Sequence, residues 1–283
     1  MSNKDQNKNN EIKEFKKFNK DFKQKVPPKP QMLLIANQLL NSETNKYSHY
    51  EMEAKFGTKG FRRITKIDYD NVVKKLKSSG FTNYNGDMYS LKIQPETLDP
   101  RTGQFRSSYD FDKFRVEIQS MTNIQEYCNT NDLKRLVDTR NCVEIIKKND
   151  VYVDDEAIKS AEFDDFNFRI TYKKEDIVSK TGKVGNEIIS NWNKCKKQFR
   201  YLNRVTFRSP TSPIIVDLSV VRSSTLVNKQ LIKTYNIDES NVFNNPEIYE
   251  IEVEVDTQEA KLAYSGRPEA LVKDIESVIK IVY

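Results

Sequence analysis

Two segments far apart in the chain carry glutamates at every second position, and this pattern restricts the fold more than any other feature. The first is YEMEAKF, residues 50–56, and the second is YEIEVEV, residues 249–255. Side chains alternate between the two faces of a β-strand, so one face of each segment is apolar and the other is charged. The charged faces hold Glu51, Glu53 and Lys55 in the first segment, and Glu250, Glu252 and Glu254 in the second.

Glutamates stacked on one strand face repel each other unless cations lie nearby. One such strand is compatible with a solvated surface, and taken alone that interpretation is slightly favoured. A second strand of the same form favours a shared site. The segments between the two carry the cations, each of which taken singly is also compatible with an exposed strand charge: Arg115, Lys147, Lys148, Arg169, Lys173, Arg200, Arg204 and Arg222.

Alternation predicts about eight strands, mostly antiparallel, which would close into a barrel or pack as a sandwich. Besides the two glutamate segments, the predicted strands are 87–94, 113–119, 142–149, 167–173, 199–207 and 214–221. Helices are predicted at 31–41, 68–80, near 122–136 and at 268–282, where apolar residues form one stripe. In a closed barrel, alternate residues point into the lumen, so carboxylates and basic groups would face each other there.

The length allows either one large domain or two small ones, and the pattern of strands and helices predicts an α+β fold, mainly β. The 283 residues carry a formal net charge of +6, which suits an anionic partner without naming one. Residues 1–29 are rich in Lys and Asn and are predicted to be a mobile basic tail, and residues 30–283 are expected to form a single domain. No apolar run is long enough to span a membrane, no signal peptide is evident, and the three cysteines predict neither a disulfide framework nor a zinc site.

Clustered carboxylates without cysteine or histidine clusters favour a hard cation such as Mg²⁺ or Mn²⁺. Opposing arginines and lysines favour phosphate. A metal ion and several basic groups around phosphate oxygens form the arrangement that phosphoryl transfer requires. An in-line attack by water needs no protein nucleophile. This agrees with the single histidine, His49, which lacks a serine or cysteine motif around it and is expected to pack or lie on the surface.

The ordered segments resemble the triphosphate tunnel metalloenzymes, and most closely the RNA 5′-triphosphatase domain of capping enzymes of large DNA viruses and the fungal-type RNA triphosphatases. EMEAK resembles the E-x-E-x-K opening strand of that family, and YEIEVEV resembles its second glutamate strand. RYLNR resembles its R-x-K-x-R strand, with Leu202 in place of the usual lysine, and VDLSVVR resembles another of its strands, with Arg222 in place of lysine. The resemblance runs from about residue 47 to residue 255 and implies an eight-stranded antiparallel barrel, the triphosphate tunnel, with peripheral helices.

The resemblance also implies roles for individual residues. The metal would be held by Glu51, Glu53 and Glu254, with Glu250 and Glu252 beside them. Glu175 or Glu252 would orient or deprotonate water, and Lys55 would contact a phosphate oxygen or hold the carboxylates. Substrate contacts would come from Arg115, Lys148 (or Lys147), Lys173, Arg169, Arg200, Arg204, Asp217, Ser219 and Arg222.

The implied activity is removal of the γ-phosphate from 5′-triphosphate RNA, the first step of mRNA capping. Two alternatives remain at this point: hydrolysis of tripolyphosphate or nucleoside triphosphates, and a non-catalytic RNA- or phosphate-binding module. The K-x-D-G motif of guanylyl transfer is absent. We therefore expect guanylyltransferase and methyltransferase modules in cis or in trans, the first case if the chain is excised from a longer capping enzyme. A cytoplasmic location, or a viral factory or virion if the chain is viral, is expected, with no membrane partner.

Overall fold

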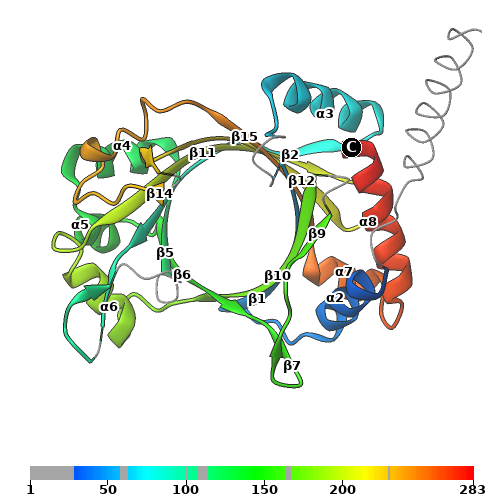
Figure 1. Ribbon diagram of the computed structural model, residues 1–283, viewed down its shortest axis with the longest axis horizontal. Coiled ribbons are helices and arrows are strands. Elements are labelled where there is room, and N and C mark those ends of the chain that lie inside the picture. Colours follow the sequence, from blue (N-terminus) through cyan, green and yellow to red (C-terminus); the bar gives the residue numbers. More distant parts are fainter. Residues whose placement is uncertain (1–28, 58–62, 100, 107–113, 164–166, 229) are drawn as a thin grey trace, which may run out of the picture.

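The computed structural model describes residues 29–57, 63–99, 101–106, 114–163, 167–228 and 230–283. Eight long strands and several short ones make up the sheet structure (Figure 1). The long strands are β1 (Ser48–Phe56), β2 (Thr82–Pro95), β5 (Phe114–Gln119), β6 (Val143–Asp150), β10 (Phe168–Ile177), β11 (Lys197–Arg208), β12 (Ile214–Ser223) and β15 (Ile248–Val255). The short ones are β3 (Thr97–Leu98), β4 (Phe105–Arg106), β7 (Tyr152–Val153), β8 (Glu156–Ala157), β9 (Ala161–Phe163), β13 (Leu226–Val227) and β14 (Gln230–Leu231).

The long strands close into a barrel, which confirms the predicted architecture. They are hydrogen-bonded in the order β1-β15-β12-β11-β2-β5-β6-β10, and β10 pairs with β1 to complete the circle. Every one of these pairings is antiparallel. Strand β9 adds to β10 outside this circle. Closure leaves β1 between β15 and β10, so the two glutamate segments become neighbours.

Helices cover the outside of the barrel on two opposite sides (Figure 1). On one side lie α2 (Lys29–Asn41), α3 (Lys66–Ser78), α7 (Thr257–Ala263) and α8 (Pro268–Val282), and on the other lie α4 (Met121–Thr130), α5 (Leu133–Thr139) and α6 (Lys183–Ser190). The one-turn helix η2 (Asp238–Ser240) precedes β15. Each helix layer encloses an apolar core against the outward faces of the strands. The lumen is therefore free to hold polar groups.

Local sequence explains the limits of these helices. Thr65 caps α3 through a reciprocal pair of hydrogen bonds with Asp68, and Gly80 follows its end at φ +82°. Pro268 begins α8, and the predicted apolar stripe of that helix is buried. The predicted helix near 122–136 is wrong as a single element. Asn131 adopts a left-handed conformation after α4, and Asp132 then caps α5.

The predicted tail lies outside the described residues except for Lys29, where α2 begins. None of the helices in the described ranges combines the length and the apolar character that a membrane crossing requires.

Candidate active site

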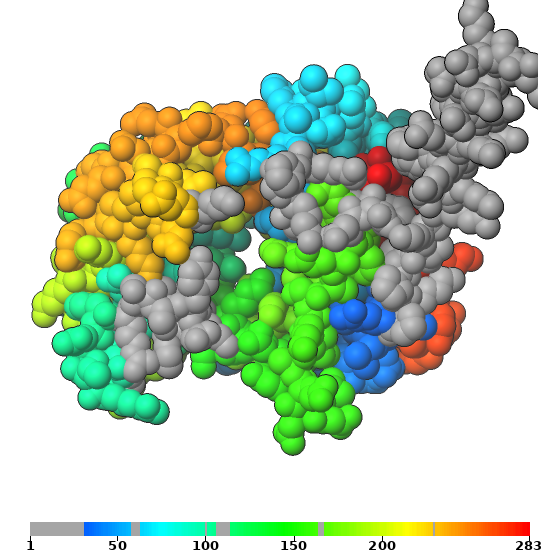
Figure 2. Space-filling view, in the orientation of Figure 1, coloured from blue at the N-terminus to red at the C-terminus, as the bar shows by residue number. Residues whose placement is uncertain are grey.

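A cavity of about 650 Å³ occupies the lumen of the barrel, and its opening lies near the centre of the face in Figure 2. Among the residues that the structure describes, eight basic side chains and four glutamates line it. The basic ones are Lys55, Lys92, Arg115, Lys148, Arg169, Lys173, Arg200 and Arg204, and the glutamates are Glu51, Glu53, Glu252 and Glu254. The excess of positive charge makes the cavity suitable for a strongly anionic ligand.

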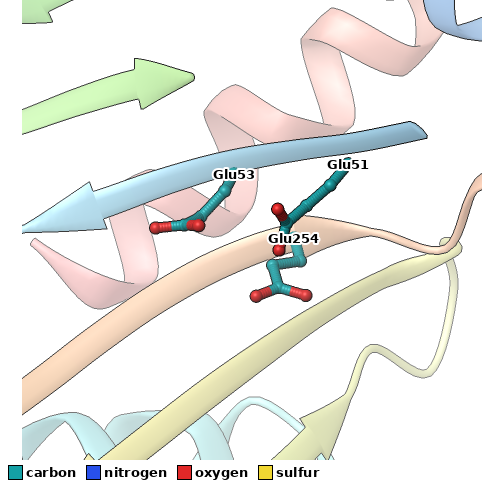
Figure 3. Close-up of side chains that lie close together, drawn as sticks. All are labelled: Glu51, Glu53 and Glu254. Carbon is teal, nitrogen blue, oxygen red and sulfur yellow. The ribbon is translucent and has the colours of Figure 1, made fainter. Parts of the chain in front are cut away.

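The two glutamate strands meet along one wall of this cavity. Glu53 of β1 lies opposite Glu254 of β15 in the strand register, and Lys55 lies opposite Glu252. Glu51 and Glu53 project from β1 toward Glu254 (Figure 3). Each of these three glutamates offers a carboxylate oxygen, and the three oxygens lie within 4.8 Å of one another. A second group with the same spacing consists of Asp217, Glu252 and Glu254, which makes Glu254 common to both.

The chemistry of this cluster fits a bound hard cation. Burial, together with the charges of Glu252 and Glu51, raises the pKa of Glu53 to about 7. Burial and the neighbouring carboxylates, first of all Asp217, also raise the pKa of Glu254 well above its ordinary value. Within the described residues, neither carboxylate has an ion-pair partner. A divalent cation with oxygen ligands would relieve this repulsion.

A network of ion pairs holds the carboxylates beside this cluster. Lys55 contacts Glu252 at 2.5 Å and Glu250 at 2.8 Å, and Arg200 also pairs with Glu250. Arg204 donates to Glu252 at 2.8 Å. Burial alone would raise the pKa of Glu252, but Lys55 and Arg204 outweigh it and lower that pKa to about 2. Glu252 is therefore ionised over the whole physiological range.

Arg204 of β11 connects side chains of β11 and the adjacent strand β12. It pairs with Asp217 and donates to the Ser219 hydroxyl at 3.1 Å. Thr206 donates to the other oxygen of Asp217 at 2.6 Å. The predicted residues Asp217 and Ser219 thus lie in the lumen, where they position Arg204.

Glu175 of β10, the other neighbour of β1 in the barrel, is the centre of a second group of contacts. Lys148 lies 2.5 Å from Glu51 and 3.3 Å from Glu175, and Arg115 lies 3.3 Å from Glu175. His49 contacts Glu175 at 3.5 Å with half of its side chain exposed. Burial alone would raise the pKa of Glu175, but His49, Arg115 and Lys148 together hold it far below its usual range. Glu175 is thus fixed as a carboxylate by three basic groups.

Arg169 and Lys173 of β10 extend the basic lining beyond this network. Lys173 pairs with Asp150 of β6 at 2.5 Å. Arg169 forms no ion pair with any residue in the described part of the chain, and its buried Nε atom has no hydrogen-bond partner there. A cation that lines a cavity without a carboxylate partner is well placed to receive an anionic ligand.

Two of the predicted substrate contacts lie outside the lumen. Lys147 pairs with Asp176 of β10 and with Phe114 of β5 in the strand register, so its side chain points to the opposite face of the sheet from that of Lys148. Its ammonium lies 6.0 Å from the centre of the Phe114 ring. Arg222 faces away from the cavity and contacts Glu247 at 2.8 Å and the Phe243 carbonyl. Strand alternation therefore separates both from the residues that line the cavity.

Sequence reasoning missed Lys92, Glu117 and His49, which contact predicted site residues of the lumen. Lys92 and Glu117 pair at 3.3 Å, and Glu117 also contacts Arg115 at 2.6 Å. Both could have been found from alternation, because Glu117 shares a strand face with Arg115, and Lys92 lies within a predicted strand. Lys92 lies opposite Arg200 in the register and lines the same cavity as Leu202, which stands where the resemblance expects a lysine. The third is His49, whose contact with Glu175 depends on the pairing of β1 with β10.

Neither a protein-family model nor a curated protein sequence matches this chain. Among solved structures, it is similar to the triphosphatase of the Mimivirus capping enzyme, with a TM-score of 0.51 and 15% identity over 89% of this chain and 96% of the other. It also matches the RNA triphosphatase Pct1 of S. pombe, with a TM-score of 0.46 and 16% identity over 91% of each chain. The second score is too low to support a shared fold. The barrel and the first of these likenesses together show that the chain has the triphosphate tunnel fold.

Proposed function

We propose that this protein is a metal-dependent RNA 5′-triphosphatase, which removes the γ-phosphate of nascent RNA and leaves a 5′-diphosphate for cap addition. One observation carries the proposal: a carboxylate cluster able to hold a divalent cation lies in the same cavity as eight basic side chains. The fold that it shares with the Mimivirus triphosphatase supports the same reaction class. Guanylyltransferase and methyltransferase modules, in cis or in trans, would complete the cap.

Glu51, Glu53 and Glu254 would hold the metal, Mg²⁺ or Mn²⁺, with Glu252 and Asp217 beside them. The metal would supply Lewis-acid polarisation of the γ-phosphate. The basic side chains around the cavity would bind the triphosphate and neutralise the charge that develops as the bond to the γ-phosphate breaks. Arg169 is the most available of them for direct contact, because it is not engaged with a carboxylate within the described ranges.

Glu175 and Glu252 would orient the attacking water rather than deprotonate it in the ground state. Both pKa values are held low by basic neighbours, so these carboxylates accept hydrogen bonds but are weak bases. Positioning of water for in-line attack is the main requirement of phosphoryl transfer, since the transition state develops little bonding to the nucleophile. No covalent enzyme intermediate is needed.

The test is release of inorganic phosphate from triphosphate-ended RNA, ATP and tripolyphosphate, with and without Mg²⁺ or Mn²⁺. We expect metal-dependent release, with the highest kcat/KM on RNA. A preference for ATP or tripolyphosphate would instead assign the chain to small triphosphates. Binding of RNA that weakens with salt, with no hydrolysis under any metal condition, would make the barrel a binding module.

Lys147 and Lys148 provide a matched pair of variants, because they are adjacent in sequence and point to opposite sides of the barrel wall. Lys148→Ala removes a cavity cation and leaves Glu51 without its ion-pair partner, so we expect kcat to fall by about 100-fold. Lys147→Ala should stay within about twofold of the unaltered protein, as for most surface changes. Steady-state phosphate release measures kcat of both variants. Equal losses would contradict the alignment of β6 that points Lys148, and not Lys147, into the cavity.

A further inference from the structure

The hairpin of β13 and β14 forms part of the edge of the cavity. Leu231, at the end of β14, lines the cavity together with Gln198 of β11. The Gln198 side chain donates a hydrogen bond to the Leu231 carbonyl at 3.0 Å, which fixes the hairpin against the barrel wall. In Figure 2 the yellow and orange atoms of this part of the chain lie beside the central opening. A ligand chain that leaves the cavity on this side must cross this segment.

The chain continues from Leu231 along the start of β11. Lys197 and Thr234 exchange two backbone hydrogen bonds, of 2.7 and 2.9 Å, so the segment is held in an extended form. The next residue, Tyr235, is 51% exposed, although tyrosine usually buries most of its ring. The ammonium of the exposed Lys196 lies 5.5 Å from the centre of that ring. An aromatic face and a cation therefore lie together just outside the cavity.

The nearby acidic groups do not neutralise this pair. The Glu239 carboxylate accepts hydrogen bonds from the Tyr235 backbone amide at 3.2 Å and from the Asn236 side chain at 2.7 Å. Glu96 accepts a hydrogen bond from the backbone amide of Lys196 at 3.1 Å. Both carboxylates are occupied with the main chain or an amide, and Lys196 forms no ion pair with any residue that the structure describes. Its charge remains available to an anionic partner.

Aromatic faces beside lysines are the usual means of holding single-stranded nucleic acid, because bases stack on the ring and the cation pairs with the phosphodiester. Tyr235 is four residues from Leu231, a span of at most about 14 Å of extended chain. A nucleotide a short distance from the 5′ end would reach the ring while the triphosphate occupied the basic cavity. The position relative to that cavity favours RNA over a protein partner for this patch.

We propose that Tyr235 and Lys196 form a subsite for the RNA chain next to its 5′-triphosphate, in which a base stacks on Tyr235 and Lys196 pairs with a phosphodiester group. The subsite rests on the proposed triphosphatase function, since it takes the triphosphate in the cavity as its reference point. It would give the enzyme its preference for RNA over tripolyphosphate.

The test compares kinetics on a short triphosphate-ended RNA and on tripolyphosphate. Tyr235→Ala should raise KM for the RNA by about tenfold with kcat unchanged, and leave both constants for tripolyphosphate unchanged. Tyr235→Phe, which keeps the stacking face, should behave as the unaltered protein. Lys196→Ala should reduce the salt dependence of RNA binding by roughly one phosphate contact. Tyr152→Ala is the matched control, because Tyr152 is 62% exposed on the separate β7–β8 hairpin.

Equal effects on RNA and tripolyphosphate, or no effect on either, would overturn the subsite. A separate measurement keeps it testable if no phosphate is released from any substrate and the proposed function fails. Fluorescence anisotropy with labelled RNA should then show about tenfold weaker binding to Tyr235→Ala than to Tyr152→Ala. Equal affinities of the two variants would refute the subsite by itself.

Discussion

Glu53→Gln is expected to abolish metal-dependent phosphate release, with a loss of at least about 1,000-fold in kcat. Glu53 is one of the three glutamates whose oxygens converge within 4.8 Å, and glutamine keeps its shape while removing the charge that a cation requires. The barrel should remain intact, because Glu53 has no ion pair to lose among the described residues. Steady-state phosphate release with saturating Mg²⁺ or Mn²⁺ measures the effect.

The same substitution should stabilise the metal-free protein at high pH. The pKa of Glu53 is raised from 4.5 to about 7, so the folded state binds its proton more tightly than the unfolded state does. Stability is therefore lost as the pH rises from the unfolded to the folded pKa, by about 1–3 kcal/mol in total. Glutamine does not titrate and avoids this loss. In chelator at pH 8 we expect the Tm of Glu53→Gln to exceed that of the unaltered protein by roughly 2–10 °C, and the difference to shrink at pH 5.

Added metal should reverse this order, because it binds the folded unaltered protein and stabilises it by mass action. The variant should gain much less. Glu156→Gln, an exposed change on β8, serves as the control and should alter neither Tm nor activity. Metal-dependent phosphate release retained by Glu53→Gln would remove Glu53 from the metal site. An unchanged Tm at pH 8 would show that the carboxylates do not repel each other as the geometry implies.

Strand alternation was sufficient to place most of the site, because inward and outward positions differ by a single residue. The E-x-E segments and the arginines of 199–207 could be assigned to one face without knowledge of the fold. Alternation alone cannot say which of two adjacent lysines points into the lumen. For Lys147 and Lys148 this depends on how β6 is aligned with β10 and β5. Long-range pairing fixes that register.

Closure of the barrel could not be derived from local pattern. β1 lies between β15 and β10, and β15 lies about two hundred residues further along the chain. The pairing of β1 with β15 brings Glu51, Glu53 and Glu254 together. The pairing of β1 with β10 creates the contact of His49 with Glu175. The predicted strand at 167–173 also ended too early: β10 continues to Ile177, and this extension carries Glu175 into the lumen. Charged residues at 173–176 obscured the strand end, although Lys173 and Glu175 pair with charges on the neighbouring strand β6 rather than facing solvent.

Arg204→Ala is expected to cause the largest loss of stability among single lumen changes. The guanidinium pairs with Asp217 and with Glu252, and both carboxylates are buried. Removal of one partner of a buried ion pair leaves the other charge uncompensated and costs about 3–5 kcal/mol. For a domain of this size the Tm should fall by roughly 6–20 °C, and kcat by about 100-fold. Thermal unfolding in chelator, followed by phosphate release below the new Tm, separates the two effects.

Arg222→Ala removes a basic side chain from the outer face of the same two strands, β11 and β12, and serves as the control. Arg222 contacts Glu247 at 2.8 Å on the surface, where an ion pair contributes about 0–1 kcal/mol. Its loss should therefore leave Tm and kcat nearly unchanged, although the resemblance places Arg222 among the substrate contacts. The destabilisation by Arg204→Ala should also be smaller at pH 4 than at pH 8. Glu252 keeps Lys55, but Asp217 loses its ion-pair partner and can take up a proton at the lower pH. Comparable losses in both variants, or a loss in Arg204→Ala that does not depend on pH, would mean that the charge of Arg204 does not compensate buried carboxylates in the lumen.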